Sequence, residues 1–159
     1  MTEMPRAGDR VEDFTLDCTD GRFTLSERVK GGPVLLYFYV VNFGKTCTNY
    51  MAEMNERFDD FKKRNITLYH VNDASIEDHR GWMNHTASKY QILSDPDKAV
   101  CRQFDCIVRK AKSDKIIGYP NRGFFLIDKD LKVLFSWQAD MPMETVPMDE
   151  LFAEIDKAL

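Results

Sequence analysis

Residues 35–48 are LLYFYVVNFGKTCT, and this stretch predicts how the rest of the chain folds around it. From Val34 to Val41 the chain is apolar throughout, without the alternation of a half-exposed strand. This pattern predicts a central β-strand that is covered on both faces. A short loop follows, and Cys47 stands where the next helix is predicted to begin. We therefore expect a buried strand that delivers a thiol to a helix N-terminus.

Such a position favours cysteine redox chemistry. A thiol is a good nucleophile only as its thiolate. The unpaired N–H groups and partial positive charge of a helix N-terminus stabilise that anion. Taken alone, Cys47 has a simpler interpretation as a buried and unreactive cysteine, which is a common fate for this residue type.

Strand and helix patterns alternate on both sides of this stretch. We expect a hairpin around Asp20-Gly21, because this dipeptide favours tight turns. Further strands are expected at 66–71 and 92–93, helices at about 76–90, 97–104 and 149–159, and a second hairpin from 124–128 and 132–137. This order predicts a single α/β domain over residues 1–159 with a thioredoxin-like fold. Its central mixed sheet is flanked by helices, and a β-hairpin stands at the N-terminus.

Composition excludes several classes of function. The net charge of −4 argues against a general nucleic-acid binder, and no stretch approaches the roughly 20 apolar residues of a membrane span. The polar start of the chain lacks a signal-peptide core, so we expect a cytoplasmic location with reduced thiols. The histidines lack zinc-site spacing with any cysteine pair and there is no glycine-rich phosphate loop, so no metal or other cofactor is expected.

Several short sequence motifs follow one another along the chain in an order that can be compared with known families. They are Gly8-Asp9, Asp13-Phe14-Thr15-Leu16, Tyr37-Phe38-Tyr39, Cys47-Thr48, Leu93-Ser94-Asp95-Pro96-Asp97 and Arg122 ahead of Phe125-Leu126-Ile127-Asp128. With these motifs, the chain from Gly8 to about Trp137 resembles the peroxiredoxins of the AhpC/TSA superfamily. It is most similar to the bacterioferritin comigratory, or PrxQ, type.

The resemblance implies a function and two catalytic residues. It implies a thiol peroxidase in which the Cys47 thiolate attacks a hydroperoxide and forms a sulfenic acid, with Arg122 holding the thiolate and polarising the peroxide. The implied partners are a hydroperoxide substrate and a thioredoxin-like or low-molecular-weight thiol reductant, and the implied assembly is a monomer or homodimer. A non-enzymatic redox sensor or binding protein on the same scaffold is the alternative.

The active-site motif departs from the family pattern. The family has Pro-x-x-x-Thr-x-x-Cys, whereas this chain has Val40 and Gly44 at the proline and threonine positions, and Tyr50 replaces the usual glutamate. The threonine hydroxyl of the family positions the peroxide. Thr46 and Tyr50 are the candidates to replace that hydroxyl, so Gly44, Thr46 and Tyr50 form the predicted substrate-binding set.

A second catalytic cysteine is not evident from the family positions. Those positions hold Ala52, Trp82 and Met83, which leaves Cys106 and Cys101 as the candidate resolving cysteines. Core filling is the simpler role for Cys101, and a disulfide between Cys101 and Cys106 would require the helix to end between them. A one-cysteine mechanism with an external thiol is therefore the simplest interpretation.

Overall fold

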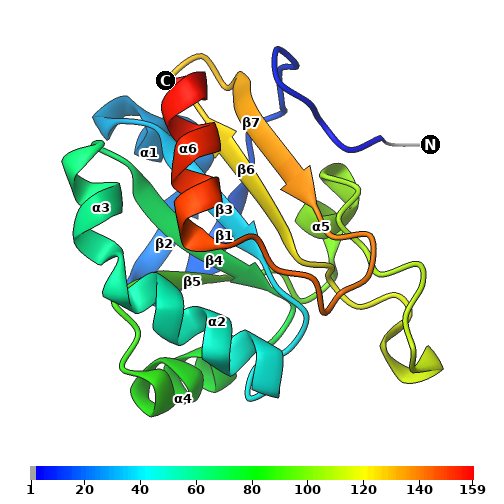
Figure 1. Ribbon diagram of the computed structural model, residues 1–159. Helices are drawn as coiled ribbons and strands as arrows, with labels where there is room; N and C mark the ends of the chain where they lie inside the picture. The colour runs from blue at the N-terminus through cyan, green and yellow to red at the C-terminus, as the bar shows by residue number, and fades with distance from the viewer. Residues whose placement is uncertain (1–2) are drawn as a thin grey trace.

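A computed structural model describes residues 3–159 and shows a single mixed sheet in that part of the chain (Figure 1). The strand order is β2-β1-β5-β4-β3-β6-β7. Strands β3, β4 and β5 pair in parallel, and the other pairs are antiparallel. The strands are β1 (Thr15–Cys18), β2 (Gly21–Thr24), β3 (Val34–Phe38), β4 (Thr67–Asn72), β5 (Gln91–Ser94), β6 (Gly123–Ile127) and β7 (Val133–Gln138). The predicted mixed sheet and N-terminal hairpin are thus confirmed.

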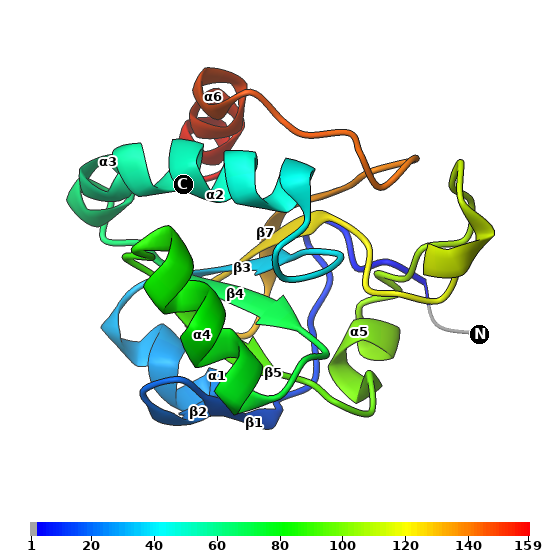
Figure 2. The ribbon, with the colours of Figure 1, turned by 90° about the horizontal axis from the view of Figure 1, so that it is seen from below.

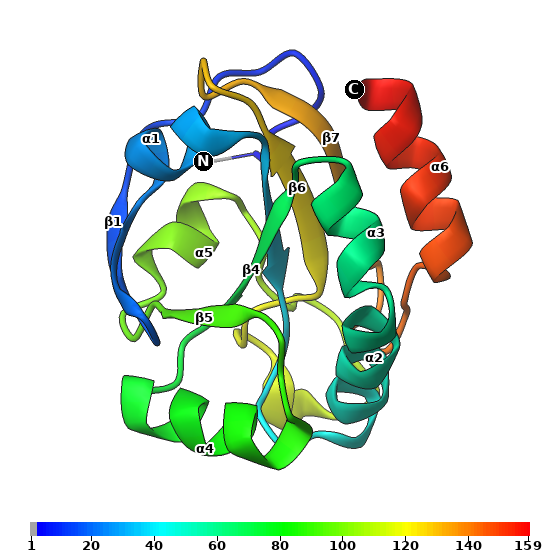
Figure 3. The same ribbon diagram turned by 90° about the vertical axis from the view of Figure 1, so that its left-hand side faces the viewer.

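Helices cover both faces of the sheet (Figure 2). Figure 3 views the sheet nearly edge-on, with α2, α3 and α6 on one side and α1 and α5 on the other. The helices are α1 (Leu25–Arg28), α2 (Lys45–Glu56), α3 (Phe58–Lys63), α4 (Ile76–Thr86), α5 (Ala99–Gln103) and α6 (Met148–Ala158), and short 3-10 turns occur at η1 (Val29–Gly31) and η2 (Asp114–Ile116). The described residues therefore form the flanked α/β architecture that the sequence predicts.

Strand β3 occupies the centre because both of its faces are apolar. Leu35 and Tyr37 point into the core beneath α2, α4 and α6, whereas Leu36 and Phe38 point into the core beneath α1 and α5. The strand ends at Phe38, three residues before the predicted Val41. Beyond Phe38, the Asn72 side chain of β4 donates to the carbonyls of Tyr39 and Val40, at 2.8 and 3.1 Å, in place of a backbone N–H.

Two helices are shorter than the apolar pattern predicts. Helix α4 ends at Thr86 instead of residue 90, because Ala87 takes a left-handed conformation and the Ser88 N–H closes the helix end on the Met83 carbonyl at 3.0 Å. The apolar stripe after Cys47 continues without a break in the sequence, but the structure divides it at Arg57 into α2 and α3.

Candidate active site

The candidate site lies at the loop that connects β3 to the first turn of α2. Gly44 is the N-cap residue of α2, with φ −70° and ψ 143°, and its carbonyl accepts the first helical hydrogen bond from the Thr48 N–H at 2.8 Å. Cys47 falls in the first turn of this helix and is only 6% exposed. The predicted helix start is confirmed, and Cys47 lies among N–H groups that have no partner within the helix.

A buried polar network holds the loop between β3 and α2. The Tyr39 hydroxyl donates to Asn42 Oδ1 at 2.5 Å, and the Asn42 amide lies 3.1 Å from His79 Nδ1 on α4. His79 Nε2 lies 3.4 Å from the Asn72 carbonyl, so Nε2 carries the proton and Nδ1 accepts from Asn42. Burial lowers the pKa of His79 to about 4, which keeps this ring neutral. The network fixes the loop that precedes Cys47.

Arg122 reaches this loop through the pairing of β3 with β6. Phe38 pairs with Gly123, so the last residue of β3 lies beside the first residue of β6, and Arg122 directly precedes that residue. The Arg122 side chain makes several contacts there: Nη2 lies 3.6 Å from Cys47 Sγ, and Nε donates to the Pro142 carbonyl at 3.2 Å. Nη1 donates to the Tyr37 hydroxyl. The Arg122 guanidinium thus contacts Tyr37, Cys47 and Pro142 at once.

The electrostatics of this cluster favour a charged arginine. Arg122 is 1% exposed, and burial alone would lower its pKa, but its interactions with Tyr37 and Cys47 outweigh that effect and raise the pKa. Burial raises the pKa of Tyr37 well above its ordinary value despite the arginine, so the phenol stays protonated. A buried cation requires polar partners, and the Tyr37 hydroxyl, Cys47 Sγ and the Pro142 carbonyl supply them.

The family of the chain follows from comparison with known proteins. The model of the AhpC/TSA family matches residues 7–136, which include both Cys47 and Arg122. The chain belongs to the AhpC/TSA family. Peroxiredoxin 2 of Picrophilus torridus is 31% identical over 144 residues, covering 87% of this chain and 67% of that protein. The 1-Cys peroxiredoxin B of Oryza sativa subsp. japonica is 28% identical over 137 residues, covering 82% of this chain and 62% of that protein.

Solved structures agree with this assignment. The structure of peroxidoxin BcpB from Mycobacterium tuberculosis superposes with a TM-score of 0.77 at 25% identity, covering 97% of this chain and 94% of that one. The resemblance to peroxiredoxins of the bacterioferritin comigratory kind is thus confirmed. The chain spans about two thirds of the length of the two curated relatives above, at 67% and 62%.

The substituted positions of this AhpC/TSA site lie close to the sulfur. A Cβ atom on Gly44 would lie 4.0 Å from Cys47 Sγ, so a side chain at this position would lie beside the sulfur. Thr46 is half-buried and makes no side-chain hydrogen bond to residues 3–159. The Tyr50 hydroxyl donates to the Val146 carbonyl at 2.5 Å, and its ring face lies 5.9 Å from the guanidinium carbon of Arg122. The predicted role of Tyr50 as the replacement hydroxyl does not fit this geometry, because the hydroxyl already donates its hydrogen bond to the Val146 carbonyl.

The other cysteines lie across the sheet from Cys47. Cys18, Cys101 and Cys106 belong to the core beneath α1 and α5, whereas Cys47 belongs to the core beneath α2. Burial raises the pKa of the Cys18 thiol to about 11 and the pKa values of Cys101 and Cys106 still further. Helix α5 does end between Cys101 and Cys106, and the Cys106 N–H closes onto the Cys101 carbonyl at 2.9 Å. The structure therefore brings these two candidates near each other but not near Cys47.

Three residues of the site were not predicted from the sequence. Tyr37 contacts Arg122, and Asn42 and His79 hold the loop. The signal for Tyr37 was a hydroxyl within an otherwise apolar strand, since a buried tyrosine usually needs a hydrogen-bond partner. No comparable signal marks His79, because only the packing of α4 against the loop brings its ring to Asn42.

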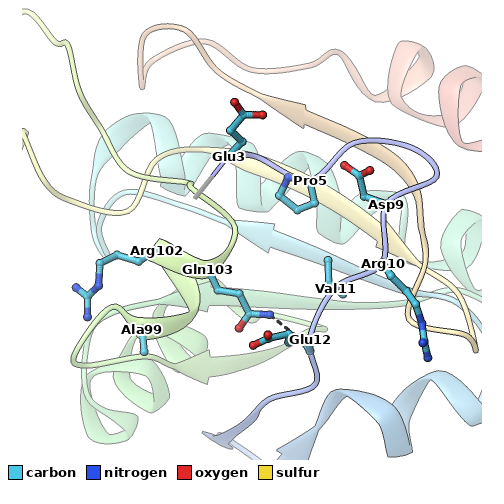
Figure 4. Close-up of a pocket in the computed structure, with 9 residues that line it drawn as sticks. All are labelled: Glu3, Pro5, Asp9, Arg10, Val11, Glu12, Ala99, Arg102 and Gln103. Atoms are coloured by element: carbon cyan, nitrogen blue, oxygen red, sulfur yellow. Dashed lines mark hydrogen bonds between the residues drawn. The ribbon is translucent and has the colours of Figure 1, made fainter. Parts of the chain in front are cut away.

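Two hollows on the described surface include neither Cys47 nor Arg122 in their linings. A hollow of about 720 Å³ between the N-terminal segment and α5 is lined by Glu3, Pro5, Asp9, Arg10, Val11, Glu12, Ala99, Arg102 and Gln103. Figure 4 shows that its charged side chains point in different directions and do not converge on one point. A second hollow, of about 560 Å³, borders the loop before α2, with Val40 and Phe43 in its lining. Among residues 3–159, no helix has the length and apolarity needed to cross a membrane.

Proposed function

We propose that the chain is a thiol-dependent peroxidase that reduces hydrogen peroxide or organic hydroperoxides through a sulfenic acid at Cys47. The contact between Arg122 Nη2 and Cys47 Sγ, at the first turn of α2, carries this proposal. It joins a nucleophile to a buried cation inside the segment that matches the family. The peroxiredoxin names of the relatives agree with it.

The chemistry requires no group beyond these residues and the substrate. The Cys47 thiolate attacks the terminal oxygen of the hydroperoxide, forming an S–O bond as the O–O bond breaks. The alkoxide or hydroxide that leaves takes up a proton and departs as alcohol or water. Arg122 donates hydrogen bonds to the charge that moves from sulfur to oxygen, and the N–H groups of the first turn of α2 lie beside the same charge.

An external thiol completes the cycle. One thiol condenses with the sulfenic acid and releases water, and a second thiol reduces the resulting mixed disulfide. A thioredoxin-like protein or a low-molecular-weight thiol serves as this reductant, since Cys18, Cys101 and Cys106 lie on the far face of the sheet. The enzyme acts as a monomer or homodimer, and a cytoplasmic location suits the supply of reduced thiol.

The test uses the purified chain and its Cys47→Ser variant, with Cys18→Ser as the matched control. One equivalent of hydrogen peroxide is added, sulfenic acid is trapped with dimedone, and the modified residue is located by mass spectrometry. We expect trapping at Cys47 in the wild type and in Cys18→Ser, with repeated turnover once a thiol reductant is supplied. Oxidation without turnover would instead indicate a redox sensor, and no reaction with peroxide would indicate a binding protein.

A further inference from the structure

Tyr37 lies at the centre of the site, and the sequence motif that contains it, Tyr37-Phe38-Tyr39, assigns it no role there. It is on β3, is 2% exposed, and points toward α2 with its hydroxyl on Arg122 Nη1. The same guanidinium presents Nη2 to Cys47 Sγ at 3.6 Å. One planar group therefore bridges a phenol and the reactive sulfur.

The hydroxyl of Tyr37 is the one that the folded chain directs at this arginine. Gly44 has no side-chain oxygen, and the Tyr50 hydroxyl is bound to the Val146 carbonyl. The guanidinium has three partners: the Tyr37 hydroxyl, Cys47 Sγ and the Pro142 carbonyl. Because the group is flat and its donors are fixed in one plane, contacts on three of its nitrogens determine its orientation.

Packing holds the Tyr37 ring itself in place. Its centroid lies 4.8 Å from Phe124, 5.1 Å from His70, 5.7 Å from Tyr50 and 6.0 Å from Tyr39. A phenylalanine at this position would keep those ring contacts and would lack only the oxygen. Removal of that oxygen leaves Arg122 Nη1 buried without an acceptor, and a buried donor in that state moves toward another partner.

We propose that Tyr37 is a positioning residue, whose hydroxyl orients the Arg122 guanidinium so that Nη2 faces Cys47 Sγ. This role rests on the proposed peroxidase function for its effect on turnover, but its effect on the thiol does not depend on that function.

The test compares Tyr37→Phe with Tyr69→Phe. Tyr69 is a matched control because its hydroxyl also accepts from an arginine, Arg28 Nη1 at 2.8 Å, but in the core on the opposite face of the sheet. We expect Tyr37→Phe to slow Cys47 oxidation by hydrogen peroxide about 10-fold to 100-fold, and to move the pH profile of Cys47 alkylation by iodoacetamide to higher pH. Tyr69→Phe should change neither, and thermal unfolding of both variants reports any loss of stability.

A double-mutant cycle with Arg122→Met separates positioning from simple packing. If Tyr37 acts through the arginine, Tyr37→Phe has no further effect on alkylation once Arg122 is methionine. An alkylation profile of Tyr37→Phe equal to that of Tyr69→Phe would overturn the proposal, as would an equal effect with and without Arg122. If the wild type fails to consume peroxide, the proposed function fails, while the alkylation measurements still decide the role of Tyr37.

Discussion

Restoring the family threonine at Gly44 should raise the reactivity of Cys47 toward peroxide. Gly44 has φ −70° and ψ 143°, an extended conformation that threonine adopts without strain. The new Cβ would lie 3.1 Å from Val41 Cγ1 and 4.0 Å from Cys47 Sγ. Val41 is 40% exposed, so its side chain can turn away toward solvent. The hydroxyl would then stand near the sulfur, which Arg122 Nη2 also contacts at 3.6 Å.

The expected gain follows from the worth of one hydrogen bond in the transition state. A single donor in an oxyanion hole contributes about 100-fold to 1000-fold to rate. Because Arg122 and the N–H groups of α2 already serve the same charge, we expect about a 10-fold increase for Gly44→Thr. The free energy of unfolding should change little. Threonine restricts the unfolded chain more than glycine does, which raises the free energy of unfolding by about 0.4–1 kcal/mol. The crowding at Val41 offsets part of this gain, so the change in Tm stays below about 3 °C.

Gly44→Val is the matched control, since valine has the shape and backbone stiffness of threonine without the hydroxyl. The rate constant for Cys47 oxidation is measured for both variants by quenching with an alkylating reagent and counting modified thiols by mass. Thermal unfolding is recorded alongside. The reasoning is refuted if Gly44→Thr is folded and no faster than Gly44→Val, because the hydroxyl would then contribute nothing at this position.

Three further predictions test the site and the cores. Arg122→Met should slow Cys47 oxidation about 100-fold and destabilise the fold by about 1–3 kcal/mol, because the buried partners of the guanidinium lose their donor; equal rates would remove Arg122 from the mechanism. After one equivalent of peroxide, peptide mapping should show oxidised Cys47 and no Cys47–Cys106 disulfide, since the sheet separates the two sulfurs. Finally, burial lowers the folded-state pKa of His79 to about 4 and that of His70 to about 3, so the unfolded chain binds protons first as the pH falls below about 6.5. The free energy of unfolding should therefore decrease by about 3 kcal/mol for His79 alone between pH 6.5 and 4, as measured by urea unfolding, and a flat profile would contradict the neutral buried rings.

The sequence alone identified the core strand, the candidate catalytic cysteine and the family. An unbroken apolar run can be buried on both faces only in the middle of a sheet, and this predicted the central position of β3. The motifs from Gly8 to Trp137 carried the fold, and their order placed Cys47 at a helix start and Arg122 ahead of a strand. These features depend only on neighbouring residues and on the order of motifs, so they can be predicted from the sequence without the structure.

Element ends depended on tertiary contacts. The stripe from Met51 to Phe61 continues through Arg57, but Arg57 leaves the helical conformation, with φ −103° and ψ 15°. Its guanidinium packs 4.7 Å from the Phe152 ring of α6 and bonds Asp149 at 2.9 Å. The helix break coincides with contacts to a segment about 90 residues away, which no local pattern reveals.

The direction in which each hydroxyl points also depended on the tertiary structure. Thr46, Tyr50 and Tyr37 all carry an oxygen near Cys47 in the sequence, and the pattern of residues favoured the first two. The direction of the Tyr37 hydroxyl depends on two features of β3. Its side chains alternate between the two faces of the sheet, and the pairing of Phe38 with Gly123 places Arg122 over the face that Tyr37 shares. An apolar strand buried on both sides carries no mark of which face meets the active site, because polarity alone distinguishes faces in a sequence. Only the folded chain could therefore bring the Tyr37 hydroxyl to the arginine that contacts Cys47 Sγ.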